Sequence, residues 1–148
     1  MLREAHATWQ GGPYAGKGSV STSSRVLSNV NYGLGSSRAE GAFTTPYELL
    51  AAAIASSMSK LVAQQMARFG IRPSEVDTQV TLMLEDFENP QRVTSANLVI
   101  TARTSGNEST EFQAVVEAAR RECPIWNAMK LDLTCEAKLI SAMTPALV

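Results

Sequence analysis

The chain is poor in the residue types on which several common functions depend. It has one histidine and two cysteines in 148 residues, and the cysteines form no Cys-x-x-Cys pair, so we expect no metal site built from its side chains. Its 13 basic and 14 acidic residues give a net charge of −1 without a basic run, which argues against nucleic acid as a partner. Its longest apolar run is far shorter than the roughly 20 residues that cross a bilayer, so we expect no membrane partner.

The residues that are present fit a packed globular protein. Hydrophobic residues make up 45% of the chain and charged residues 18%, and the length suits a single domain spanning 1–148. The first residues are polar where an export signal would be apolar, so we expect a cytoplasmic protein in which Cys123 and Cys135 are thiols. The sequence has no motif for a tightly bound cofactor, and we expect none.

The spacing of apolar residues predicts an α+β fold with mainly antiparallel pairing. Ala5, Ala7 and Trp9 alternate with polar neighbours, and two later segments alternate in the same way on either side of a turn. The expected elements are N-terminal strands within 1–30, a loop over 29–45, a central helix over 46–69, strands within 75–104, a helix over 109–122 and a C-terminal strand over 131–140.

The central helix has the clearest local signals. Thr45 suits the cap position, Pro46 the first helical position, and Glu48 completes a capping box with Thr45. Gly70 ends the helix. Every residue from 49 to 58 except two serines is apolar, so we expect a buried helix with no polar face.

One motif near the N-terminus is misleading. Lys17 closes a G-x4-G-K spacing, but Gly18 stands where a phosphate-binding loop has Ser or Thr, and the following residues predict a strand instead of a helix. We therefore expect no phosphate-binding loop here.

Several motifs together resemble a known family. They are GKGSVST at 16–22, YG at 32–33, RAEG at 38–41, TPYELLAAA at 45–53 and CP at 123–124. Their order and spacing over roughly residues 3 to 140 resemble the osmotically inducible protein C (OsmC) family of stress-response proteins.

The resemblance implies a fold and a chemistry. The fold is that of antiparallel sheets around a long buried central helix in an intertwined homodimer. The chemistry, shared with the organic hydroperoxide resistance proteins, is thiol-based reduction of organic hydroperoxides. A peroxidatic cysteine attacks the peroxide as a thiolate, which an arginine held by a glutamate stabilises. A second cysteine condenses with the resulting sulfenic acid, and an external dithiol reduces the disulfide.

Two of the four positions that the resemblance marks carry other residues here. Arg38 falls on the arginine position and Cys123 on that of the resolving cysteine. Tyr47 stands at the glutamate position, and Ser57 at that of the peroxidatic cysteine. A serine hydroxyl is not ionised at neutral pH and cannot be oxidised to a sulfenic acid, so two-cysteine turnover should be absent. The double departure favours natural divergence over a single engineered change.

These residues lead to two expectations for function. In the first, peroxidase activity is reduced or lost, and a small amphipathic ligand binds at the dimer interface near Ser57, Cys123, Arg38 and Tyr47. In the second, Cys123 acts alone as a one-cysteine peroxidase with Arg38, and a thiol reduces it. A purely structural role is a weaker third alternative.

Overall fold

The computed structural model of the chain describes residues 1–33, 43–85, 92–106 and 111–141. The chain falls into two compact units, Met1–Leu50 and Ala51–Val148. Its elements, in chain order, are β1 (Ala5–Gln10), β2 (Lys17–Thr22), β3 (Val30–Tyr32), α1 (Pro46–Arg68), β4 (Pro73–Glu85), β5 (Arg92–Thr104), α2 (Phe112–Glu122), α3 (Pro124–Ala128) and β6 (Asp132–Ser141).

The first unit contains a three-stranded antiparallel sheet in the order β1-β2-β3. The predicted alternation of Ala5, Ala7 and Trp9 is confirmed as β1. The predicted loop over 29–45 needs a correction at its start, because Val30–Tyr32 forms β3 against β2, while residues 34–42 lie outside the described residues. A strand of three residues is too short to produce a recognisable alternation, so the sequence alone did not distinguish it from loop.

Two aromatic rings lie on either side of the central strand β2, near one end of this sheet. Gly18 lies between Trp9 and Tyr32 in the strand register, and the two aromatic rings are 5.8 Å apart. A Cβ atom on Gly18 would collide with the Tyr32 ring. The glycine is therefore required by the close approach of that ring to the backbone.

Helix α1 begins and ends as its sequence predicts. Glu48 accepts a hydrogen bond from the backbone N–H of Thr45 at 2.8 Å, and its own N–H donates to Thr45 Oγ1 at 3.1 Å, which completes the capping box. Gly70 has a φ of 76°. The N–H of Gly70 donates to the Ala67 carbonyl, and that of Ile71 to the Met66 carbonyl. These two bonds form a Schellman motif.

The sequence predicts that α1 is buried on all sides, but in the single chain it is not. Only one stripe of the helix is buried, namely Ile54, Met58, Val62, Gln65 and Met66. Ala52 and Ala53 are exposed although they are apolar. Apolar composition indicates which surface is suited to burial, but burial also requires a second surface that covers it.

The second unit contains a mixed sheet in the order β4-β5-β6. The two long strands β4 and β5 are antiparallel, as predicted. The expectation of antiparallel sheets is wrong for β6, which runs parallel to β5 with Ser95 opposite Asp132 and Thr104 opposite Ser141. The segment between these strands contains α2 and α3, and a helical crossover returns the chain in the same direction. Alternating apolar residues carry no information about strand direction.

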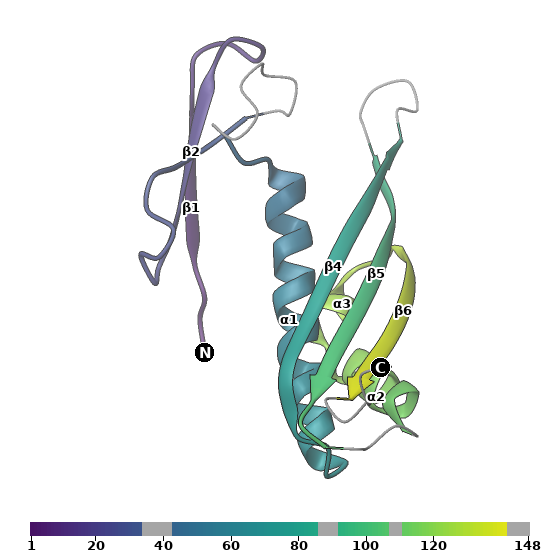
Figure 1. The fold of residues 1–148 in the computed structure, drawn as a ribbon. Coiled ribbons are helices and arrows are strands. Elements are labelled where there is room, and N and C mark those ends of the chain that lie inside the picture. The colour runs from purple at the N-terminus through teal and green to yellow at the C-terminus, as the bar shows by residue number, and fades with distance from the viewer. Residues whose placement is uncertain (34–42, 86–91, 107–110, 142–148) are drawn as a thin grey trace, which may run out of the picture. The chain divides into compact units, whose positions relative to one another are not determined.

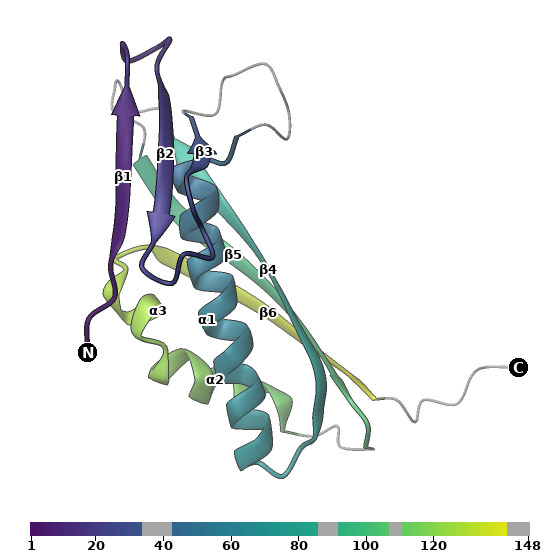
Figure 2. The same ribbon diagram turned by 90° about the vertical axis from the view of Figure 1, so that its left-hand side faces the viewer.

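The helices of the second unit lie on one face of this sheet (Figure 1 and Figure 2). Ser59 of α1 donates a hydrogen bond to Thr78 of β4, while α2 contacts β6. The buried face of β5 consists of Ala96, Leu98, Ile100, Ala102 and Thr104. Among the described residues, every buried hydrophobic side chain lies in this unit, between Ile54 and Cys123.

The helix predicted over 109–122 is observed as Phe112–Glu122, and residues 109 and 110 lie outside the described residues. Cys123 ends it, as its position before Pro124 predicts. The short helix α3, Pro124–Ala128, was not expected.

Candidate functional site

Two of the predicted site residues meet in the second unit, although 66 positions separate them in the chain. Ser57 is half-buried on α1, and Cys123 is fully buried where α2 meets α3. The Ser57 Oγ and Cys123 Sγ atoms are 3.2 Å apart, within hydrogen-bond distance for an oxygen and a sulfur. The hydroxyl of Ser57 therefore lies against the thiol that the resemblance identifies as the resolving cysteine.

The local backbone fixes the position of the Cys123 thiol. Pro124 disfavours helical geometry in the residue before it, and Cys123 adopts an extended conformation with φ −75° and ψ 110°. Cys123 thereby ends α2 and caps α3, with Pro124 at the first position of α3. Its sulfur accepts the backbone N–H of Trp126 at 3.4 Å. The thiol is held by α1 on one side and by the start of α3 on the other.

This arrangement limits what the site can do chemically. A hydroxyl and a thiol cannot form the disulfide that two cysteines would form, because the serine oxygen has no comparable redox chemistry. The Cys123 side chain has 0% of its surface exposed, so a peroxide reaches the sulfur only if neighbouring side chains move. The hydroxyl of Ser57 and the N–H of Trp126 are both able to donate to the sulfur.

Trp126 is a residue of this site that the sequence did not single out for function. Its N–H contacts the Cys123 sulfur, and the guanidinium of Arg120 lies 5.7 Å from the centroid of its ring. Arg120 also pairs with Glu117 at 3.1 Å. The Cys-Pro-x-Trp sequence contains the signal, because a cysteine before a proline at the first helical position is a possible helix cap.

Of the other two predicted residues, one lies in the other unit of the chain and one lies outside the described residues. Tyr47 is half-buried in the first turn of α1 and belongs to the first unit, whereas Ser57 and Cys123 belong to the second. Glu48, next to Tyr47, accepts hydrogen bonds from Thr44 Oγ1 and from the Thr45 N–H, in agreement with its predicted capping role. Arg38 lies outside the described residues, so its role stays a prediction.

The second cysteine has a different environment. Cys135 is half-buried on β6, on the face that the helices cover. Burial raises the pKa of the Cys135 thiol, and the nearby carboxylate of Glu117 raises it further. The nearby guanidinium of Arg120 acts in the opposite direction. Cys135 therefore remains a protonated and weakly nucleophilic thiol near neutral pH.

Neither a metal-binding cluster nor a membrane-spanning helix is present in the parts of the chain that the structure describes. No group of three or more His, Cys, Asp or Glu residues there is arranged to hold a metal ion. No helix there is long and apolar enough to span a bilayer.

Comparison with known proteins gives a consistent result. The family model described as OsmC-like protein matches residues 39–138. A curated relative, peroxiredoxin OsmC of Escherichia coli, is 29% identical over 140 residues, which cover 94% of this chain and 97% of the relative. The match includes the α1 sequence and the Cys123-Pro124 pair on which the resemblance rests.

Solved structures have the same fold at low sequence identity. An OsmC-like protein of unknown function from Vibrio cholerae has a TM-score of 0.77 at 15% identity, over 93% of this chain and 99% of the other. An organic hydroperoxide resistance protein of Bacillus subtilis has a TM-score of 0.64 at 22% identity, over 93% and 98%. An OsmC-like protein of Mycoplasma pneumoniae has a TM-score of 0.75 at 13% identity, over 95% and 98%.

Proposed function

The chain belongs to the OsmC-like protein family, and from this premise we propose that it keeps the scaffold of a thiol-dependent organic hydroperoxide reductase with reduced or lost peroxidase activity. The observation that supports the proposal is the 3.2 Å contact between Ser57 Oγ and Cys123 Sγ. The two positions are adjacent, as a peroxidatic and a resolving cysteine must be, but only one of them carries sulfur.

The chemistry of two-cysteine turnover explains why this change is decisive. A thiolate attacks one peroxide oxygen, the O–O bond breaks, and the products are a cysteine sulfenic acid and an alcohol. A second thiol displaces the sulfenic oxygen as water and forms a disulfide, which an external dithiol reduces. Ser57 cannot perform the first step, so Cys123 has no sulfenic acid on which to act.

A second candidate function uses Cys123 as the only reactive thiol. The contacts of the Trp126 N–H and the Ser57 hydroxyl with the Cys123 sulfur support it, because they fix the position of the atom that would react. In this mechanism Cys123 attacks the peroxide and becomes a sulfenic acid. One small thiol then forms a mixed disulfide with release of water, and a second thiol regenerates Cys123. The complete burial of Cys123 argues against it, because a peroxide would reach the sulfur only if neighbouring side chains moved.

We also propose that the functional form is an intertwined homodimer. The apolar residues Ala5, Ala7 and Trp9 of β1 are exposed, and among the described residues the first unit buries no hydrophobic side chain. In the sheet order β4 is an edge strand, and the Ala52–Ala53 side of α1 is exposed. A second copy of the chain would cover these surfaces.

The interface of this dimer is the proposed place for a ligand. At this interface, each site would contain Ser57 and Cys123 of one copy together with a Tyr47 phenol and an Arg38 guanidinium. Either copy of the chain would supply these last two groups. A hydroxyl, a phenol and a cation beside the apolar stretch of α1 suit a small amphipathic molecule with a polar or anionic head. Free thiols of this kind persist in the cytoplasm, where we place the protein.

The test is the consumption of an organic hydroperoxide in the presence of a dithiol. Four proteins are compared, namely the unchanged chain, Cys123→Ser, Cys135→Ser and the double variant Tyr47→Glu, Ser57→Cys. We expect turnover only in the double variant, because it restores both missing groups. Turnover by the unchanged chain that is lost in Cys123→Ser and kept in Cys135→Ser would instead establish the one-cysteine peroxidase.

A further inference from the structure

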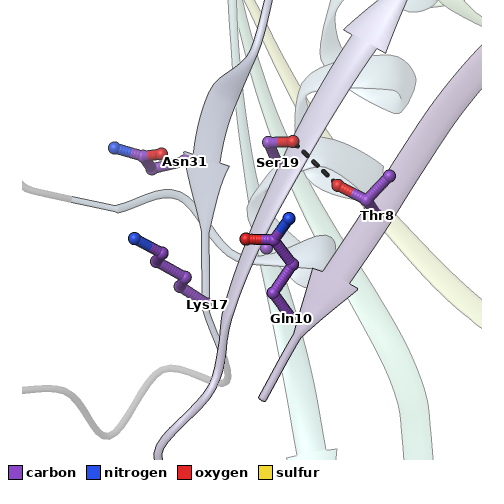
Figure 3. Close-up of a pocket in the computed structure, with 6 residues that line it drawn as sticks. Thr8, Gln10, Lys17, Ser19 and Asn31 are labelled. Atoms are coloured by element: carbon purple, nitrogen blue, oxygen red, sulfur yellow. Dashed lines mark hydrogen bonds between the residues drawn. The ribbon is translucent and has the colours of Figure 1, made fainter.

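The first unit has a shallow cavity on one face of its sheet. The cavity has a volume of about 120 Å³ and is lined by Thr8, Gln10, Lys17, Gly18, Ser19 and Asn31 (Figure 3). These residues come from all three strands β1, β2 and β3. At roughly 30 Å³ per water molecule, the space suits one small anion with a few waters.

The strand register explains why these side chains gather. Thr8, Ser19 and Asn31 form one row across the sheet, because Thr8 pairs with Ser19 and Ser19 with Asn31. Gln10 and Lys17 form the next row. Successive side chains point to opposite faces of a sheet, so this face is separate from the face that carries Trp9 and Tyr32.

The face carries several solvent-exposed hydrogen-bond donors that contact no other described residue. Within the part of the chain that the structure describes, the Lys17 ammonium and the carboxamides of Gln10 and Asn31 form neither a hydrogen bond nor an ion pair. In Figure 3 the side chains of Asn31 and Lys17 lie to the left of the Thr8–Ser19 pair, and that of Gln10 lies below it. The two hydroxyls of that pair are 3.0 Å apart, which fixes their positions. One of the two hydroxyls necessarily keeps a hydrogen to donate elsewhere.

Lys17 is the one Lys, Arg, Asp or Glu residue on this face of β1, β2 and β3. The other side chains on this face of β1 and β2 are His6, Thr8, Gln10, Ser19 and Ser21. The sheet of the second unit differs, because β4 carries Glu75 and Asp77, and Glu75 pairs with Arg103 of β5 at 3.2 Å.

We propose that this cavity binds a phosphate group, either as the free ion or on a small organic molecule. An ammonium, two carboxamides and a hydroxyl match the several oxygens of a tetrahedral anion, and Lys is a common point-charge ligand for phosphate. The site differs from a phosphate-binding loop, since Lys17 lies on a strand and contributes through its side chain. It uses none of the residues of the Ser57–Cys123 site and does not depend on the proposed function.

Titration with inorganic phosphate, followed by the amide NMR signals of the full chain, tests the proposal. We expect saturable shifts concentrated at the cavity residues, and binding that is about tenfold or more weaker in Lys17→Met, because a charge-assisted hydrogen bond is lost. Lys138→Met is the matched control. It removes the same charge from an exposed position on β6 and should bind phosphate like the unchanged chain.

A small phosphomonoester and acetate complete the test. Tighter binding of the monoester than of inorganic phosphate would identify an organic ligand, and equal or weaker binding would identify the free ion. The proposal is overturned if no saturable shifts occur at the cavity, or if Lys17→Met and Lys138→Met weaken binding equally. Saturation by acetate at the same concentrations as phosphate would also overturn it.

Discussion

The side chain at position 57 determines whether the candidate site holds one sulfur atom or two. Because Ser57 Oγ lies 3.2 Å from Cys123 Sγ, the variant Ser57→Cys places a second sulfur where a small side-chain rotation brings it to bonding distance. We expect this variant to form a disulfide with Cys123 under mild oxidation. Titration of free thiols in denaturant, before and after reduction, would detect the loss of two thiols per chain.

Ser56→Cys is the matched control for this prediction. Ser56 is exposed on α1 and donates a hydrogen bond to the Ala53 carbonyl, so it does not contact Cys123. The control should keep all of its thiols under the same oxidation. Equal disulfide formation in both variants, or none in Ser57→Cys, would contradict the observed placement of Ser57 beside Cys123.

Gln65 is a polar residue in an apolar position. Its side chain is 3% exposed in the stripe of α1 that faces the core, and its Nε2 has no hydrogen-bond partner within the described parts of the chain. A buried donor without a partner costs about 1–3 kcal/mol, whereas methionine has nearly the same shape and no such donor. Gln65→Met should therefore raise the free energy of unfolding by about 1 kcal/mol in chemical denaturation.

Gln64→Met provides the comparison, because Gln64 is exposed one position earlier on the same helix. A surface change of this kind alters stability by less than about 0.5 kcal/mol. If Gln65→Met destabilises the protein while Gln64→Met does not, the Gln65 amide has a partner such as a buried water.

For single residues, contacts between near neighbours in the chain could be predicted from the sequence, whereas contacts between distant positions could not. The capping role of Glu48 follows from residues three positions apart. The meeting of Ser57 with Cys123 joins positions that no local pattern connects, and only the family resemblance indicated it. The contact of Trp126 with Cys123 was missed because the short helix α3 was missed.

At the scale of elements, the end of α1 depends on one backbone conformation. Gly70 has a φ of 76°, which side chains with a Cβ rarely adopt, and a Cβ there would meet nothing within 4 Å. Gly70→Ala therefore tests backbone strain alone, and it should lower the free energy of unfolding by about 1 kcal/mol.

Gly12→Ala is the control, since Gly12 too has open space around it but no positive φ, and the change should be neutral or slightly stabilising. Equal effects of both changes would contradict the role given to the Schellman motif.

The elements differ in how far the sequence predicts them. Helix α1 has a cap, a first-position proline and a terminal glycine, and it was predicted to within one residue at each end. The strand pattern of β6 was also recognised, but not its direction. Direction depends on how the chain returns through α2 and α3, and the apolar spacing of the strand is the same either way.

At the scale of the whole molecule, the distribution of buried residues is uneven. The second unit holds all of the buried hydrophobic side chains that the structure describes, whereas every residue of β1 is exposed. Helix α1 is also covered unevenly. Its sequence is apolar on nearly every side, but the single chain buries only one stripe of it. Sequence alone indicates that such surfaces are suited to burial, and a second chain is the simplest source of the cover.

The proposed homodimer leads to a prediction that separates the two faces of the first sheet. Ala7→Lys places a charge on the apolar face of β1, and His6→Lys places the same side chain one residue away on the opposite face. Because a buried lysine without a partner is strongly disfavoured, Ala7→Lys should weaken dimerisation about tenfold or more, while His6→Lys should leave it unchanged. Sedimentation equilibrium of both variants and the unchanged chain measures this directly. A monomeric unchanged chain would contradict the dimer, and equal weakening by the two variants would mean that the apolar face of β1 does not form its interface.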